Sequence, residues 1–230
     1  MFKRGADLWS ELGMSDEKAV ALADLAVGYY GNGEDKIGLQ IAEEAHETAQ
    51  FLEDKAIILY CMLPLSQGYV NLKRFAKARS IAEEVIKTGE ELKNLYAQFV
   101  GHVNTADSAL MQEKFTEAEM EYGRSIEICQ SYGDFIYICV SISGLAMAVA
   151  GQGRHAKALR LIEAVNKIAE ETGLMSPEDI PMKFWQEQIK KHIIHTREQL
   201  GVKLARQYEE EGRLLSLEQA VEYALDFEKD

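Results

Sequence analysis

Two histidines and a glutamate in the C-terminal quarter of the chain are spaced three residues apart: His192, His195 and Glu198. On an α-helix this spacing places the three side chains on one face, where imidazole and carboxylate groups could bind a metal ion. One helix would supply all three ligands, and nothing in the sequence specifies a fourth. We therefore favour a surface pair in which Glu198 is an electrostatic neighbour of the histidines, and we expect no metal site.

The other patterns that could support catalysis are equally sparse. Glu43 and His46 form one Glu-x-x-His motif, whereas di-metal helical bundles use two such motifs with further glutamates. We expect His46 to be structural. The chain has no Gly-x-Ser-x-Gly elbow and no phosphate-binding Gly-x-x-x-x-Gly-Lys-Ser/Thr loop. The sequence therefore predicts a protein that is not an enzyme and carries no cofactor.

The chain has three cysteines, Cys61, Cys129 and Cys139. Their number is odd, none forms a Cys-x-x-Cys pair, and none lies in a basic setting that would lower its pKa. We expect all three to be buried as small hydrophobic residues in a reducing compartment. Neither a disulfide framework nor a zinc site is indicated.

The charge of the chain excludes several classes of partner. It has 38 acidic and 25 basic residues, which give a formal net charge of -13. Such a surface repels nucleic acids and anionic membranes, and no run of Lys and Arg forms a local basic patch. The N-terminus lacks a signal-peptide core, and no window of about 20 apolar residues could span a membrane. We expect a cytoplasmic protein.

A repeat of 40 residues organises most of the chain. Its clearest copy is Lys73–Leu92, within which the segment Arg74–Ala78 recurs as Lys114–Ala118 and Arg154–Ala158. A fixed period of this size is typical of stacked helical repeats. Small residues recur at two places in the repeat, which indicates closely packed helices; they are Gly28, Gly68, Ser108 and Ala148, and Gly38, Ala78, Ala118 and Ala158.

The expected fold is all-α: a right-handed α-solenoid of antiparallel helix pairs, tetratricopeptide-like, with a C-terminal helical tail. Each pair comprises an inner helix A and an outer helix B joined by a short turn. The predicted A helices are Ser15–Tyr30, Ala56–Leu72, Asn94–Gln112 and Asp134–Ala150, and the predicted B helices are Asp35–Leu52, Phe75–Leu92, Phe115–Ser131 and His155–Thr172. Pro64 predicts a kink near Tyr60–Pro64, or a helix that begins later.

The predicted organisation has three parts: residues 1–14, residues 15–173 and residues 174–230. The first resembles the end of a helix B, at Ala6–Leu12, which suggests a piece cut from a longer array or a short native cap. The second contains the four helix pairs. In the third, Ser176 and Pro177 predict the start of a helix that runs to about Gln199, Gly201 predicts a break, and Ser216 with Gln219 predicts a capping box.

The tail also resembles a known family. It is similar to the closing part of the C-terminal helical-repeat region of large bacterial signal-transducing NTPases, including LuxR-type transcriptional regulators; the matching segments are Ala158–Ala164, Glu171–Gly173, Arg197–Gly201 and Gly212–Leu225. The resemblance implies a sensor or scaffold module in signal transduction and transcription regulation. This chain lacks the family's nucleotide-binding loop, and the DNA-binding domain of the family would follow the tail.

Binding is expected on the concave face, which the A helices of such arrays line. The segments Ala56–Leu72, Asn94–Gln112 and Asp134–Gln152 contain no Lys or Arg, which disfavours a clamp for an acidic peptide. The groove would bind a protein or peptide segment, or else a small neutral or cationic effector; self-association is a third possibility. The candidate groove residues are Gln67, Asn71, Tyr96, His102, Asn104, Tyr137 and Ser141, with Tyr60 and Asp107 beside them.

Overall fold

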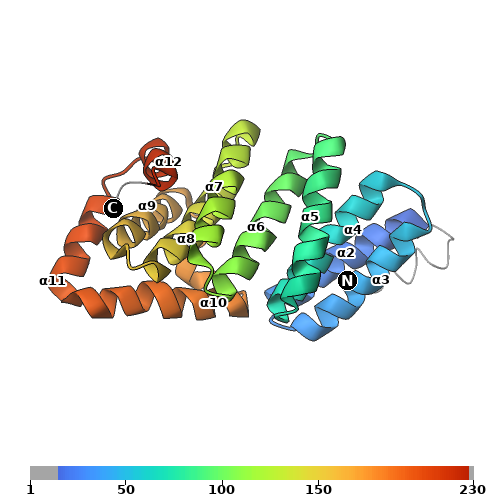
Figure 1. Cartoon of the computed structure of the whole chain (residues 1–230), viewed down its shortest axis with the longest axis horizontal. Helices are drawn as coiled ribbons and strands as arrows, with labels where there is room; N and C mark the ends of the chain where they lie inside the picture. Colours follow the sequence, from blue (N-terminus) through green and yellow to red (C-terminus); the bar gives the residue numbers. More distant parts are fainter. Residues whose placement is uncertain (1–14, 228–230) are drawn as a thin grey trace. The chain divides into compact units, whose positions relative to one another are not determined.

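The computed structural model describes residues 15–227, and all regular secondary structure in this range is helical. The segment 1–14, including the predicted end of a helix B, lies outside the described residues. Figure 1 shows the helices. The repeat region consists of α2 (Ser15–Gly31), α3 (Asp35–Gln50), α4 (Lys55–Asn71), α5 (Phe75–Glu91), α6 (Leu95–Met111), α7 (Phe115–Tyr132), α8 (Phe135–Gly151) and α9 (His155–Thr172).

The predicted helix pairs are confirmed, with boundaries within two residues of those expected. The period is finer than the sequence indicated, because successive helices begin 20 residues apart. From Ser15 the starts fall at Asp35, Lys55, Phe75, Leu95, Phe115, Phe135 and His155. The 40-residue repeat is therefore two helix–turn units of equal length.

The turns share one backbone conformation. A residue with positive φ ends each helix, again at intervals of 20 residues: Gly33, Glu53, Lys73, Lys93, Glu113, Gly133, Gly153 and Gly173. In one such turn, the backbone N–H groups of Lys73 and Arg74 donate to the carbonyls of Val70 and Tyr69, each at 2.8 Å. These bonds satisfy carbonyls that the end of a helix leaves open. Equal turns joining helices of similar length produce the repeating arrangement.

The starts of the A helices differ from those of the B helices. Three of the A helices are capped by Asx side chains: Asp54 accepts from Ala56 N at 2.8 Å, and Asn94 and Asp134 accept in the same way. The residues before α3, α5, α7 and α9 make no such side-chain bond. Side-chain capping therefore stabilises the inner helix of these pairs.

The contacts divide the chain into two compact units on either side of the Ser108–Ala109 bond, within α6. In unit 1, α4 contacts α2, α3 and α5. In unit 2, α8 contacts α7, α9 and two segments of the tail, so it is buried almost all round. This agrees with the prediction that the apolar A helices lie between neighbours.

The small positions serve close packing at Gly68 but not at Gly28. A Cβ at Gly68 would lie 2.1 Å from the hydroxyl of Tyr30, which donates to the carbonyl of Pro64 at 3.0 Å. Gly28 is exposed, and no atom lies within 4 Å of a Cβ built there; packing does not explain its small size. α4 continues from Lys55 through Pro64, so the predicted later start is wrong.

The tail is more irregular than predicted. It consists of the 3₁₀ turn η1 (Pro177–Asp179), α10 (Lys183–Gln188), the π-helix η2 (Ile189–Ile194), α11 (His195–Gly212) and α12 (Leu217–Leu225). The predicted helix from Pro177 is wrong: Pro181 follows the 3₁₀ turn and disfavours helical backbone at the residue before it. Gly201 breaks α11 with φ 73° and ψ 160°, as predicted, and the capping box at Ser216 and Gln219 is confirmed.

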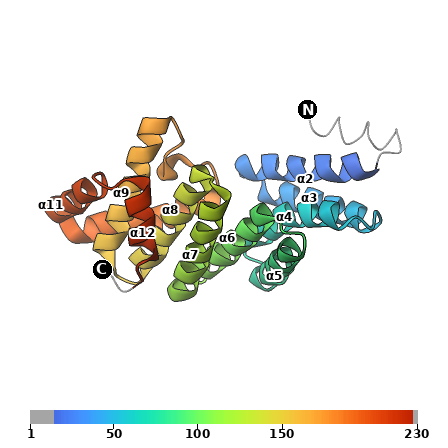
Figure 2. The same ribbon diagram turned by 90° about the horizontal axis from the view of Figure 1, so that it is seen from above.

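Charged side chains attach the tail to α9. Arg197 donates to Glu163 of α9 at 2.8 Å, and to Glu178 and Glu209 at 2.7 Å each. Trp185 is buried and donates to the Pro177 carbonyl at 2.9 Å. Figure 1 and Figure 2 both place α12 beside α9, which it contacts. Unit 2 therefore combines the last helix pair with a packed tail.

No helix in the described part of the chain combines the length and the apolar composition needed to cross a bilayer.

The shared turn predicts opposite effects of one substitution at two places. Lys73 has φ 58°, a conformation that costs an L-residue about 1 kcal/mol and glycine almost nothing. We expect Lys73→Gly to raise the free energy of unfolding by about 0.5 kcal/mol in urea titrations. Lys87→Gly, at an exposed site within α5, should lower it by about 1 kcal/mol. Equal losses from both variants would contradict the role of the turn.

Candidate functional site

One candidate surface lies on the inner helices of unit 1 and is called the α2–α4 surface; it comprises Asp24, Val27, Asp35, Tyr60, Gln67 and Asn71. The Tyr60 hydroxyl donates to Asp24 Oδ1 at 2.5 Å, which joins α4 to α2. Burial and the neighbouring Asp24 carboxylate raise the pKa of Tyr60 to about 12, so the phenol stays protonated and keeps donating. The bond orients a carboxylate on a partly exposed surface.

A second chain of hydrogen bonds runs along the same face of α4. Gln67 Nε2 donates to Asn71 Oδ1 at 2.8 Å, and Asn71 Nδ2 donates to Asp35 Oδ1 at 2.8 Å. Residues 60, 67 and 71 share this face because they are separated by seven and four positions of an α-helix. The two amides thus hold a second carboxylate at the far end of the surface.

The α2–α4 surface is acidic and partly apolar. The stretch Ala56–Asn71 of α4 contains no Lys or Arg, and the Lys55 ammonium at its start lies 3.3 Å from Glu91. Val27 of α2 is 56% exposed. Two oriented carboxylates and an exposed aliphatic side chain suit a ligand with a cationic or hydrogen-bond-donating group beside an apolar one.

The predicted groove residues lie in different environments. Gln67 and Asn71 are hydrogen-bonded to each other, Tyr96 and Tyr137 are partly exposed, and His102 is partly buried. The predicted exposure is wrong for three residues: Asn104 and Asp107 are 1% and 2% exposed, and Ser141 is fully buried and accepts from Ser125 at 2.8 Å. Extra contacts around the later A helices bury these positions, whereas α2 and α4 remain more open.

Asn104 is unusual among the buried side chains. Neither its Oδ1 nor its Nδ2 has a hydrogen-bond partner among the described residues. An unsatisfied buried amide typically costs about 1–3 kcal/mol. Asn104 occupies the place in α6 that corresponds to Pro64 in α4 and Gly144 in α8, so the amide is a departure from the repeat.

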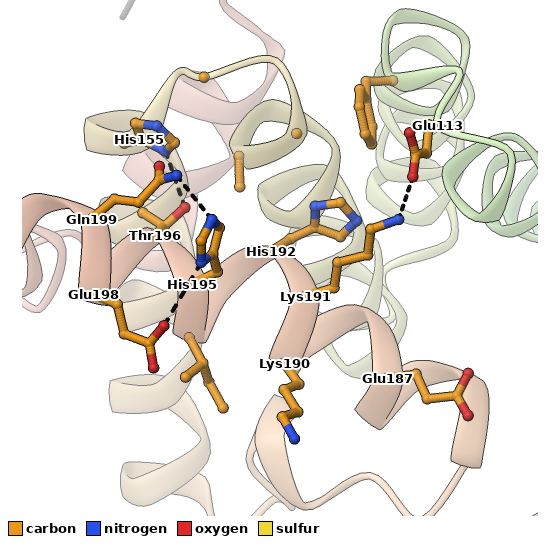
Figure 3. Close-up of a pocket in the computed structure, with 15 residues that line it drawn as sticks. Glu113, His155, Glu187, Lys190, Lys191, His192, His195, Thr196, Glu198 and Gln199 are labelled. Atoms are coloured by element: carbon orange, nitrogen blue, oxygen red, sulfur yellow. Dashed lines mark hydrogen bonds and ion pairs between the residues drawn. The ribbon is translucent and has the colours of Figure 1, made fainter.

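A second candidate site is an open pocket of about 790 Å³ within unit 2. Figure 3 shows its main side chains, which come from the α8–α9 turn, the residues around the start of α7, and the segment from α10 to α11. The polar lining residues are Glu113, His155, Glu187, Lys190, Lys191, His192, His195, Thr196, Glu198 and Gln199; Phe115, Ala150, Gly151, Gly153 and Ile194 complete the wall.

The π-helix places His192 and His195 in different environments. Its wider turns do not stack residues three positions apart as an α-helix does, so the expected surface pair of histidines is wrong. His192 is 6% exposed, contacts the Phe115 ring edge-on, and lies 3.2 Å from Gln188 Oε1. Burial, and secondarily the Lys191 ammonium, lower the pKa of His192 to about 4. This imidazole is therefore neutral at physiological pH.

His195 lies at the exposed edge of the pocket. Its Nδ1 is 3.7 Å from Glu198, as the sequence predicted, and its Nε2 accepts from Gln199 at 2.8 Å. His155 Nδ1 is hydrogen-bonded to the Thr196 hydroxyl at 3.0 Å. Among the described residues, no group of three His, Cys, Asp or Glu side chains is arranged to hold a metal ion.

The remaining sequence candidates lie outside both sites. Glu43 accepts from the Tyr69 hydroxyl at 3.0 Å, while His46 bonds Gln50 at 3.1 Å and its pKa is lowered by burial. Cys61, Cys129 and Cys139 are buried, as predicted. Burial raises the pKa of Cys61 and of Cys129 to about 12, and that of Cys139 to about 11, so none is a reactive thiolate.

Comparison with known proteins leaves the family undefined, because no family model and no curated protein matches this chain. The structure defines the class only as an all-helical protein with a regular repeat of helix pairs.

The buried imidazole predicts a pH dependence of stability. The pKa of His192 is lower in the folded state than its usual value of 6.5, so this group stabilises the fold fully above pH 6.5. The contribution falls as the pH drops through about 4, by at most about 3 kcal/mol. Histidine Cε1–H resonances followed by NMR should show one titration near pH 4 that is missing in His192→Gln. A His192 titration between pH 6 and 7 would contradict its burial as a neutral group.

Proposed function

We propose that this chain is a non-catalytic protein-binding module, a right-handed tetratricopeptide-like array whose A helices bind a segment of a partner protein. The repeat of helix pairs supports the architecture, because stacked pairs present neighbouring inner helices to a ligand. The resemblance of the tail to bacterial signal-transducing regulators supports a role as a sensor or scaffold in such a protein. The sequence also lacks the nucleophile and phosphate-loop motifs that catalysis would use.

The α2–α4 surface carries this proposal. Asp24 and Asp35 are held in place by Tyr60 and Asn71, and the surface bears no Lys or Arg. A segment with Lys or Arg side chains complements these carboxylates, and an apolar side chain of the same segment would cover Val27. An acidic segment would meet uncompensated negative charge. The partner we propose is therefore a basic segment with at least one apolar side chain.

A polar rather than hydrophobic binding surface follows from the contacts already present. Gln67 and Asn71 are partly buried and hydrogen-bonded, so their amides are ordered before any ligand arrives. Pre-ordered side chains lower the entropic cost of binding. Backbone groups of an extended or frayed partner segment could bond to the remaining amide atoms.

Synthetic peptides of matched length and composition, differing only in Lys/Arg against Glu content, test this function by isothermal titration. We expect the basic peptides to bind and the acidic ones not to bind. Asp24→Asn with Asp35→Asn should weaken binding by about 10-fold or more, because charge-assisted hydrogen bonds are worth about 1.5–3 kcal/mol. The matched control, Glu83→Gln with Glu90→Gln, removes the same charge from exposed sites of α5.

Three outcomes would contradict the proposal. The control variant could weaken binding as much as the Asp24 and Asp35 variant, which would indicate a general charge effect. A small neutral or cationic metabolite could bind where no peptide does, which would make this surface an effector site. A mass that rises with protein concentration in light scattering, with no peptide bound, would indicate self-association.

A further inference from the structure

The pocket of unit 2 contains a buried hydrogen-bonding atom that the fold leaves unused. Gln188 Oε1 can only accept, so His192 Nε2 carries the hydrogen that bonds it at 3.2 Å. In the neutral imidazole, Nδ1 then carries a lone pair. No partner for Nδ1 is present among the described residues, although the side chain is more than nine-tenths buried. A ligand that donates a hydrogen would satisfy this atom.

The neighbouring histidines are occupied to different extents. Both ring nitrogens of His195 have neighbours, Glu198 and Gln199. His155 uses Nδ1 to bond the buried Thr196. His192 is thus the imidazole best placed to accept from a ligand, and the other two are held by their own partners.

Beside His192 the pocket has one close pair of opposite charges. Lys191 Nζ lies 2.5 Å from Glu113 Oε1 and bridges η2 to the turn before α7. Figure 3 shows this pair on the side of the π-helix that also presents His192, whereas Lys190 and Glu187 point away from it. The pair is exposed enough to exchange partners, with 47% and 61% of the two side chains accessible.

The charge balance selects the class of ligand. A simple anion could bind Lys191 but would face Glu113, and a simple cation could bind Glu113 but would face Lys191. A ligand with both charges can pair with both residues at once, and its ammonium group can also donate to His192 Nδ1. Because an exposed ion pair contributes only about 1 kcal/mol or less, a zwitterion can displace it at little cost.

We propose that this pocket binds a free α-amino acid. Its carboxylate accepts from Lys191, its ammonium donates to Glu113 and His192, and its side chain lies against the apolar wall of Phe115, Ala150 and Ile194. The volume of about 790 Å³ is in the range of small-molecule sites and leaves room for a large apolar side chain. The site lies within unit 2 and is independent of the α2–α4 surface proposed for partner binding.

Titration calorimetry of the full chain with L-leucine and L-phenylalanine tests the proposal. Each amino acid is paired with its deaminated and its decarboxylated analogue: 4-methylpentanoate and 3-methylbutylamine for leucine, and 3-phenylpropanoate and 2-phenylethylamine for phenylalanine. We expect at least one amino acid to bind, and both of its analogues to bind about 10-fold more weakly, since each lacks one charge-assisted contact. Glycine should also bind more weakly, because it lacks the apolar side chain.

Single variants locate the site. Lys191→Met and Glu113→Gln should each weaken binding by about 10-fold. The matched controls, Lys55→Met and Glu91→Gln, break an exposed ion pair in unit 1 and should leave binding unchanged. His192→Gln provides a variant that keeps both charges, and it should also weaken binding. Circular dichroism confirms that each variant is folded.

The proposal fails if neither amino acid binds at concentrations up to about 10 mM, a range in which even weak ion-paired ligands give measurable heat. It also fails if the deaminated or decarboxylated analogue binds as well as the amino acid, or if Lys191→Met and Glu113→Gln behave like their controls. Each of these results would remove the zwitterion as the ligand of this pocket.

Discussion

The residue with positive φ at the end of each repeat helix is the constraint on which the array depends. It recurs every 20 residues from Gly33 to Gly173 and reverses the chain with the same backbone bonds each time. Equal turns between helices of similar length set every second helix on the same side of the layer, which makes α2 and α4 neighbours. The bond from Tyr60 to Asp24 and the bond from Asn71 to Asp35 each span 36 residues, one repeat less one helical turn.

Much of the fold could be predicted from the sequence because the repeat is long and regular. The helix pairs, the buried A helices and the capping box at Ser216 all follow from periodicity and residue type. The 20-residue unit was not evident because Glu53, Lys73, Lys93 and Glu113 occupy a conformation for which glycine is the usual signal. The π-helix was not predictable either, because Ile189–Ile194 has an ordinary helical composition.

The candidate sites were less predictable, because they depend on which neighbours cover each helix. Gln67 and Asn71 were identified from the absence of cations on the inner helices, but their acceptor Asp35 was missed. A search for polar pairs 36 residues apart could have found it. Asn104 and Ser141 have similar polar side chains but lie where α6 and α8 are buried. His192 required the structure, since its burial depends on how the tail folds back on unit 2.

Amide hydrogen exchange on the full chain, measured with and without a bound basic peptide, tests the central claim most directly. Binding at the α2–α4 surface predicts slower exchange in Ser15–Gly31 and Lys55–Asn71, and little change in the outer helix Phe75–Glu91 or in the tail. Protection confined to the outer helix, or to the segment from Lys183 to Gly212 that contains the pocket, would contradict the account.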